Sequence, residues 1–105
     1  MSHVALCIRF TLRDGAGEAF DELVHETAAV VRTQESGTLV YACSGVEGAP
    51  AQRVFFELYT DRSAFEEHGR QPRVRHFLAE CKKYAERTEI DRLHLYAGKY
   101  PTGSE

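Results

Sequence analysis

The chain has 105 residues, of which 43% are hydrophobic, and its formal net charge at pH 7 is −3. This length predicts a single domain over residues 1–105, with an ordered core over about residues 1–98 and a tail over residues 99–105. The small negative charge disfavours a nucleic-acid-binding or anionic-membrane-binding surface, because both partners require a basic patch.

The three cysteines, Cys7, Cys43 and Cys81, are widely spaced and include no C-x-x-C pair. This pattern disfavours a disulfide framework and a zinc site, so we expect reduced thiols and no bound metal. The amino terminus lacks the basic region, apolar run and cleavage site of a signal peptide. No segment approaches the ~18 apolar residues of a membrane span. The sequence therefore predicts a soluble, cytoplasmic protein.

The first half of the chain reads as strand, helix, strand. Residues 3–12 alternate between apolar and other side chains, which predicts a strand with Val4, Leu6, Ile8, Phe10 and Leu12 on one face. Asp14 is the expected cap of the next helix, whose apolar residues recur at helical spacing from Phe20 to Val31. Ser36 and Gly37 end that helix. A second strand over residues 38–46 leads through residues 45–50 into an antiparallel hairpin.

The second half begins with a strand over residues 53–59. Its alternation predicts a core face of Val54, Phe56 and Leu58 and an opposite face of Arg53, Phe55, Glu57 and Tyr59. Thr60 and Asp61 cap a short helix that carries His68, and Gly69 and Pro72 separate it from a helix over about residues 73–84. A last strand is expected over about residues 90–98.

This order of elements predicts an α+β fold, the ferredoxin-like βαββαβ plan with a four-stranded antiparallel sheet. Both helical segments cover one face of the sheet. The uncovered face is predicted to carry Arg9, Phe55, Tyr59, Arg92, His94 and Tyr96. Exposed rings on a sheet favour association, so we expect a homodimer whose two sheets face each other.

Several segments resemble the antibiotic biosynthesis monooxygenase (ABM) domain family, and the resemblance covers nearly the whole chain. They are Leu12-Arg13-Asp14-Gly15, the segment ESGTLVY at 35–41, the segment FFELYTDRSAFEEH at 55–68, and Phe77. Ser36 replaces the usual Pro of the family, and Tyr59 stands where Trp or Tyr is usual. The resemblance implies a dimeric α/β barrel.

The resemblance also implies a range of activities. Some family members are monooxygenases that oxidise quinols or polycyclic aromatic phenols with neither metal nor flavin, so no cofactor is expected. Others degrade haem, and others isomerise or bind small metabolites. The haem-degrading branch typically uses an Asn, a Trp and a His, but this chain has Cys7 and Leu78 near two of those positions and contains no Trp. Haem degradation is therefore disfavoured.

Two residues are the candidate catalytic groups. His68 has an imidazole that accepts a phenolic proton near neutrality, and Glu57 would orient His68 or a substrate hydroxyl. The alternatives are that His68 is a helix-end residue stabilised by the helix dipole, and that Glu57 forms an ion pair with Arg9 or Arg92. Phe55 and Tyr59 are the expected walls of the pocket, although sheet aromatics also serve as dimer core.

Arg9, Arg92, His94 and Tyr96 complete the candidate substrate-binding set. The first hypothesis is a cofactor-independent monooxygenase acting on a quinol or aromatic phenol. The second is a non-catalytic dimer, binding a small hydrophobic metabolite or serving as an accessory protein. The third is an isomerase of a small hydroxy-carbonyl metabolite, in which Arg9 and Arg92 hold an anionic group.

Overall fold

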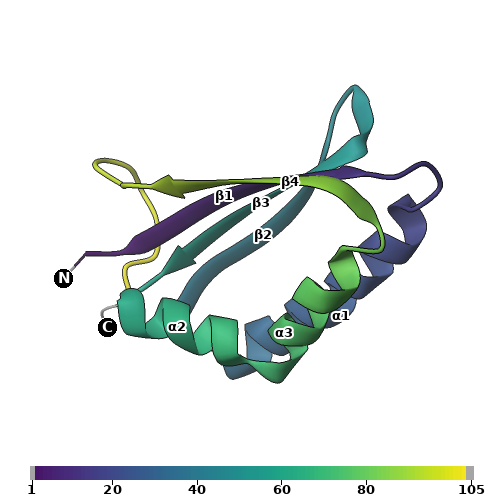
Figure 1. Ribbon diagram of the computed structural model, residues 1–105. Helices are drawn as coiled ribbons and strands as arrows, with labels where there is room; N and C mark the ends of the chain where they lie inside the picture. The colour runs from purple at the N-terminus through teal and green to yellow at the C-terminus, as the bar shows by residue number, and fades with distance from the viewer. Residues whose placement is uncertain (1, 104–105) are drawn as a thin grey trace.

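The computed structural model describes residues 2–103. In chain order its elements are β1 (Val4–Leu12), α1 (Gly17–Gln34), β2 (Thr38–Val46), β3 (Ala49–Tyr59), α2 (Arg62–Arg70), α3 (Pro72–Cys81) and β4 (Ala85–Leu93). The strands form one antiparallel sheet in the order β2-β3-β1-β4, and all three helices cover the same face (Figure 1). The predicted ferredoxin-like α+β fold is confirmed.

The helices begin where local chemistry allows, although not always at the predicted residue. Asp61 caps α2 as predicted, and its Oδ1 accepts a hydrogen bond of 2.9 Å from the backbone N–H of Ala64. The predicted Asp14 cap of α1 is wrong, because the N-cap is Ala16 and makes no side-chain hydrogen bond. Gly15, with φ +77°, makes the turn between β1 and α1.

The predicted boundaries in the second half are wrong in four places. Strand β3 begins at Ala49 instead of at residue 53, so the connection before it is shorter than the predicted residues 45–50. Gly69 lies inside α2, and the break before α3 falls at Gln71, where the backbone is extended and Pro72 follows. The next helix, α3, ends at Cys81 instead of near residue 84. Strand β4 begins at Ala85 instead of near residue 90 and ends at Leu93, because Arg13 N–H bonds to the carbonyl of Tyr84 and starts the pairing early. Most of β4 is exposed and charged, which hides its alternation.

The predicted faces of β3 are also wrong. Leu6 and Ile8 of β1 lie opposite Glu57 and Phe55, so these residues share the helix-covered face of the sheet. Phe55, Glu57 and Tyr59 are therefore buried beneath the helices rather than lying on the uncovered face. The pattern was ambiguous because both faces of β3 are largely apolar and Leu58, on the other face, is buried as well.

The uncovered face is partly closed at one end by the chain after β4. This segment turns back toward the amino terminus (Figure 1). His3 Nε2 lies 3.2 Å from the carbonyl oxygen of Thr102, and the rings of His3 and Tyr100 meet edge to face at 5.5 Å. The rest of that face remains open in the single chain.

Candidate active site

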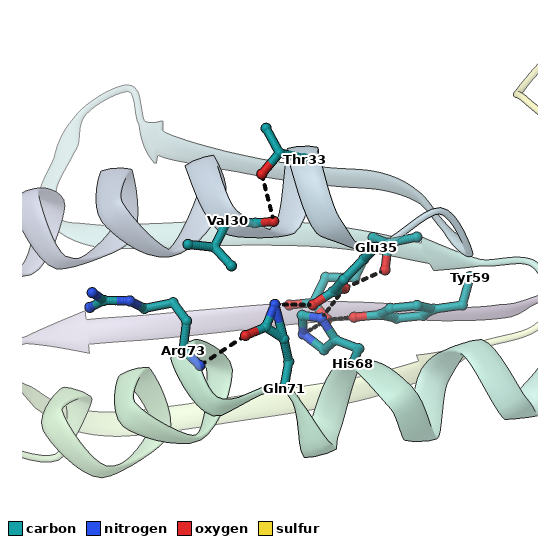
Figure 2. A network of polar contacts seen from close by, with 9 residues as sticks. Val30, Thr33, Glu35, Tyr59, His68, Gln71 and Arg73 are labelled. Carbon is teal, nitrogen blue, oxygen red and sulfur yellow. Dashed lines mark hydrogen bonds and ion pairs between the residues drawn. The ribbon is translucent and has the colours of Figure 1, made fainter.

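A cluster of ionisable side chains lies between α2 and the end of the sheet nearest to it. His68 projects from α2, Tyr59 from β3, and Glu35 from the turn after α1 (Figure 2). Glu57 also belongs to β3, two residues before Tyr59. His68, Glu57 and Tyr59 are 6%, 4% and 0% exposed, so these polar groups depend on one another for hydrogen bonds.

The imidazole of His68 lies between two carboxylates. Its Nδ1 is 2.8 Å from Glu35 Oε1, and its Nε2 is 3.9 Å from Glu57 Oε1. Tyr59 donates a hydrogen bond of 2.6 Å to the same Glu57 oxygen. Thr38 Oγ1 donates to Glu35 Oε1 at 2.6 Å. Because an ionised carboxylate only accepts hydrogen bonds, the short contact with Glu35 places the proton of neutral His68 on Nδ1 and leaves Nε2 facing Glu57.

Burial sets the direction of the pKa shifts in this cluster. The pKa of Glu57 is raised from 4.5, chiefly by burial and also by the charge of Glu35, while the Tyr59 hydrogen bond and His68 oppose the shift. The pKa of Tyr59 is raised by burial and by the charge and hydrogen bond of Glu57. Both phenols near Glu57, Tyr59 and Tyr41, have raised pKa values and so stay protonated at neutral pH.

Two tyrosine rings enclose the His68 imidazole. The ring of Tyr59 lies 5.2 Å from it and the ring of Tyr41 lies 5.4 Å from it, measured between centroids. Tyr41 is on β2, directly opposite Glu57 of β3. Tyr41 therefore separates the cluster from the space on its other side.

That space is a pocket of about 700 Å³ between α1 and the hairpin of β2 and β3. Its apolar walls include the rings of Phe20, Tyr41 and Phe55, and Cys43 lies among them. Burial raises the pKa of the Cys43 thiol to about 12, so the thiol stays protonated. We call this space the ring-lined pocket.

An ion pair between β3 and α1 forms part of the wall of the ring-lined pocket. Arg53 Nε donates to Asp21 Oδ1 at 2.7 Å and Nη2 donates to Oδ2 at 3.0 Å. Arg53 Nη1 also donates to the carbonyls of Pro50 and Gln52 at 2.9 Å. Because its donors are engaged in these bonds, Arg53 joins β3 to α1 in the pocket wall rather than offering an anion site.

A second, polar hollow of about 480 Å³ lies between the turn after α1 and α2. Glu35, Thr38, Glu67 and Gln71 are among its lining residues. The Glu35 carboxylate therefore borders this hollow while it contacts His68. We call this space the polar hollow.

The structure brings together only part of the predicted site. His68, Glu57 and Tyr59 are in contact, and Phe55 lines the adjacent pocket.

The other predicted site residues lie elsewhere. Arg9 lies opposite Val54 and Glu89 on the uncovered face, whereas Arg92 lies opposite Leu6 on the helix-covered face. The remaining two, His94 and Tyr96, follow β4 and are exposed.

Two further predictions about these residues, the ion pair of Glu57 and the anion clamp of Arg9 and Arg92, can be compared with the structure. The predicted ion pair of Glu57 with Arg9 or Arg92 is wrong, because Glu57 contacts Tyr59 and His68. Arg92 instead lies 5.1 Å from the ring of Phe65, a cation–π contact. The predicted anion clamp of Arg9 and Arg92 is wrong within one chain, because the two side chains leave opposite faces of the sheet.

Sequence reasoning missed Glu35 and Tyr41. Both lie in the segment 35–41 that carries the family resemblance. Glu35 follows the end of α1, a position at which the sequence pattern predicts a surface carboxylate. Tyr41 shares a strand face with Cys43, and this apolar pattern predicts a core position. Only the packing of α2 against the sheet shows that they meet His68.

Within residues 2–103 no group of three or more His, Cys, Asp or Glu side chains is arranged to hold a metal ion. None of the helices in the same range is long and apolar enough to cross a membrane.

The chain belongs to the antibiotic biosynthesis monooxygenase (ABM) family. The family model matches residues 3–80, which include both carboxylates, the imidazole and all three rings of the pocket. The predicted family resemblance is thereby confirmed. A search of the curated proteins gave no match.

Solved structures share the fold at low sequence identity. Rv0793 from Mycobacterium tuberculosis is 26% identical, with a TM-score of 0.85 over 92% of this chain and 98% of its own. PA3566 from Pseudomonas aeruginosa is 22% identical, with a TM-score of 0.84 over 92% of this chain and 97% of its own. SO0527 from Shewanella oneidensis is 20% identical, with a TM-score of 0.83 over 90% and 91% of the two chains.

Replacing Glu57 by Gln should change how stability depends on pH. Because the pKa of Glu57 is raised on folding, the stability that its neutral form provides is fully present below pH 4.5 and is lost as the pH rises through the folded-state pKa. The unfolding free energy of the wild type minus that of Glu57→Gln should therefore fall as the pH rises above 4.5, and it should level off above the folded-state pKa. Urea unfolding at a series of pH values measures it.

The same series in a Tyr59→Phe background gives the control. Removing the Tyr59 hydrogen bond removes an interaction that lowers the pKa of Glu57, so the loss of stability should extend to higher pH. A difference that stays constant with pH in both backgrounds contradicts the raised pKa.

Proposed function

We propose that this protein is a monooxygenase that oxidises a quinol or aromatic phenol in the ring-lined pocket, using neither metal nor flavin. Membership of the ABM family supports a monooxygenase-like role. The observation that carries the choice of an aromatic substrate is the pocket itself, which is walled by the rings of Phe20, Tyr41 and Phe55 beside a buried acid–base cluster. Flat rings stack favourably on such walls.

The proposed reaction begins with loss of the phenolic proton. The resulting anion is electron-rich and donates an electron to O2, after which one oxygen atom bonds to the ring and the other leaves as water. For a phenol the products are a quinone and one water molecule, which balances the phenol and O2 consumed. His68 is the proposed base and Glu57 its partner, because Nε2 faces that carboxylate.

Tyr41 is the residue through which the proton reaches His68 in this proposal. It lines the pocket on one side and packs against the imidazole on the other, while His68 itself does not line the pocket. Its raised pKa, due to burial and the Glu57 charge, keeps the hydroxyl protonated. The hydroxyl of Tyr41 therefore gives its proton to His68 as it accepts one from the substrate, so the Tyr41 side chain never holds a full negative charge.

Filling the ring-lined pocket should weaken substrate binding while the fold is kept. Gly45 lines the pocket, its φ is unexceptional, and a Cβ placed there meets no atom within 4 Å. In Gly45→Phe the KM for a quinol, followed by oxygen uptake, should rise about tenfold or more, which corresponds to at least ~1.4 kcal/mol of lost binding. Gly69→Phe on α2, where a Cβ is also unhindered, is the matched control.

The two variants decide whether the pocket holds the substrate. If Gly45→Phe turns over the quinol with the same kcat and KM as the wild type, the substrate binds elsewhere. No oxygen uptake by the wild type with any quinol or phenol removes the monooxygenase proposal.

The second candidate function is a non-catalytic protein that binds an aromatic metabolite in the same pocket. The burial of His68, with Nδ1 bonded to Glu35, favours it, because a base closed off from substrate needs a relay. Under this hypothesis quinols raise the melting temperature of the wild type without oxygen uptake, and Gly45→Phe loses that shift.

We also propose that a second copy of the chain covers the open sheet face. Strand pairing places several apolar side chains on that face, away from the helices: Cys7, Val40, Ala42, Val54, Phe56 and Leu93. Light scattering should give twice the mass of the chain, and Phe56→Glu should give the mass of one chain, because a carboxylate buried without a partner is costly. A wild type that stays monomeric at millimolar concentration contradicts the dimer.

A further inference from the structure

Glu35 follows the end of a helix, but its carboxylate is buried and accepts several hydrogen bonds. Only 9% of its side chain is exposed. Oε1 accepts from His68 Nδ1 at 2.8 Å, and Oε2 accepts from Gln71 Nε2 at 3.4 Å (Figure 2). Oε1 also accepts from Thr38 Oγ1 at 2.6 Å. These bonds come from α2, from β2 and from the residue joining α2 to α3, so the carboxylate is fixed from three directions.

We propose that Glu35 is a positioning residue for the reaction: it holds the proton of His68 on Nδ1, aims Nε2 at Glu57, and stabilises the imidazolium that forms when Nε2 accepts a proton. This inference rests on the proposed oxidation of a phenol. The Nε2–H bond forms while the Nδ1–H bond stays intact, and the positive charge is balanced by Glu35 at 2.8 Å. No proton needs to move to Glu35.

The geometry assigns different roles to the two carboxylates. Glu57 lies 3.9 Å from Nε2, beyond hydrogen-bond distance, and its pKa is raised by burial. Glu35 makes the short bond to Nδ1. One nitrogen of the imidazole is thus bonded to a carboxylate while the other makes no hydrogen bond among the described residues, which is the arrangement that general-base histidines require. Glu35 therefore orients the base, and Glu57 faces its reactive nitrogen.

The polar hollow makes this role testable. Glu35 lines the hollow, so truncation to Ala opens a path from solvent to Nδ1 of His68. A small carboxylate such as formate then has space to take the place of the missing group. Glu67 lines the same hollow, but its carboxylate forms an ion pair with the exposed Arg70 at 3.8 Å instead of contacting His68. Glu67→Ala is therefore the matched control.

The experiment measures quinol-dependent oxygen uptake of the wild type, Glu35→Ala, Glu35→Gln and Glu67→Ala, with and without formate. We expect Glu35→Ala to lower kcat by about 100-fold or more, and formate to restore at least a tenth of it. Glu35→Gln keeps an acceptor for Nδ1–H but no charge, so it should also lose kcat, with KM little changed. Glu67→Ala should match the wild type in both conditions.

The outcomes separate this inference from the proposed function. An active wild type with Glu35→Gln equally active overturns the charge-stabilising role, and failure of formate to act on a folded Glu35→Ala overturns the positioning role. If the wild type consumes no oxygen, the proposed function fails, and ¹⁵N NMR of His68 still decides the orientation. Neutral His68 should carry its proton on Nδ1 in the wild type and lose that preference in Glu35→Ala; an Nε2–H tautomer in the wild type overturns the inference.

Discussion

Phe55→Ala should be the most destabilising single truncation in the sheet, lowering the unfolding free energy by about 3–5 kcal/mol. Phe55 is 1% exposed. Its ring centroid lies 4.9 Å from Phe10, 5.9 Å from Phe77 and 5.8 Å from Tyr41. Removing it leaves a cavity between β3, α1 and α3 that these rings fill only in part. A domain of this size is stable by about 5–15 kcal/mol in total.

Chemical denaturation measures the change, and Leu78→Ala is the matched control. Leu78 is a large apolar residue of α3 that is 51% exposed, so its truncation should change stability by no more than about 0.5 kcal/mol. If Phe55→Ala costs no more than Leu78→Ala, Phe55 does not lie beneath the helices. That result reinstates the face on which the sequence pattern alone places Phe55.

His68→Ala should have the largest effect on activity, lowering kcat for quinol oxidation by about 100- to 10,000-fold. The variant removes the only imidazole in contact with Glu57 within residues 2–103. It also leaves the buried side chains of Glu57 and Glu35 without the imidazole that lies between them. Stability should therefore fall at neutral pH and recover in acid, where the carboxyls are protonated.

Because this variant changes both stability and chemistry, two further variants accompany it. His68→Gln keeps hydrogen-bond donors and acceptors in the cluster but no proton-accepting ring, so it should fold better than His68→Ala and remain as inactive. His76→Ala, on the exposed side of α3, should keep wild-type oxygen uptake. Equal rates for the wild type and a folded His68→Gln remove His68 from the mechanism.

The order of elements could be read from the sequence because each segment carries its own local signal. The alternation of residues 3–12, the helical stripe from Phe20 to Val31 and the Asp61 cap depend only on neighbours along the chain. These signals predict the ferredoxin-like plan. The segment over residues 53–77 offers an acid, a phenol and an imidazole together, which singled out Glu57 and His68, and these two side chains lie 3.9 Å apart. Boundaries failed where charge hid the pattern, as in β4.

Tertiary structure alone decided which side of β3 meets the helices and which carboxylate holds His68. Phe55 and Phe56 are equally apolar, so the choice between faces depends on strand register with β1, where Ile8 lies opposite Phe55. Glu35 lies 33 positions from His68 along the chain, and its bond to the imidazole exists only because α2 packs over the end of α1 and the start of β2. Such a contact depends on packing between distant segments, and no pattern within either segment encodes it.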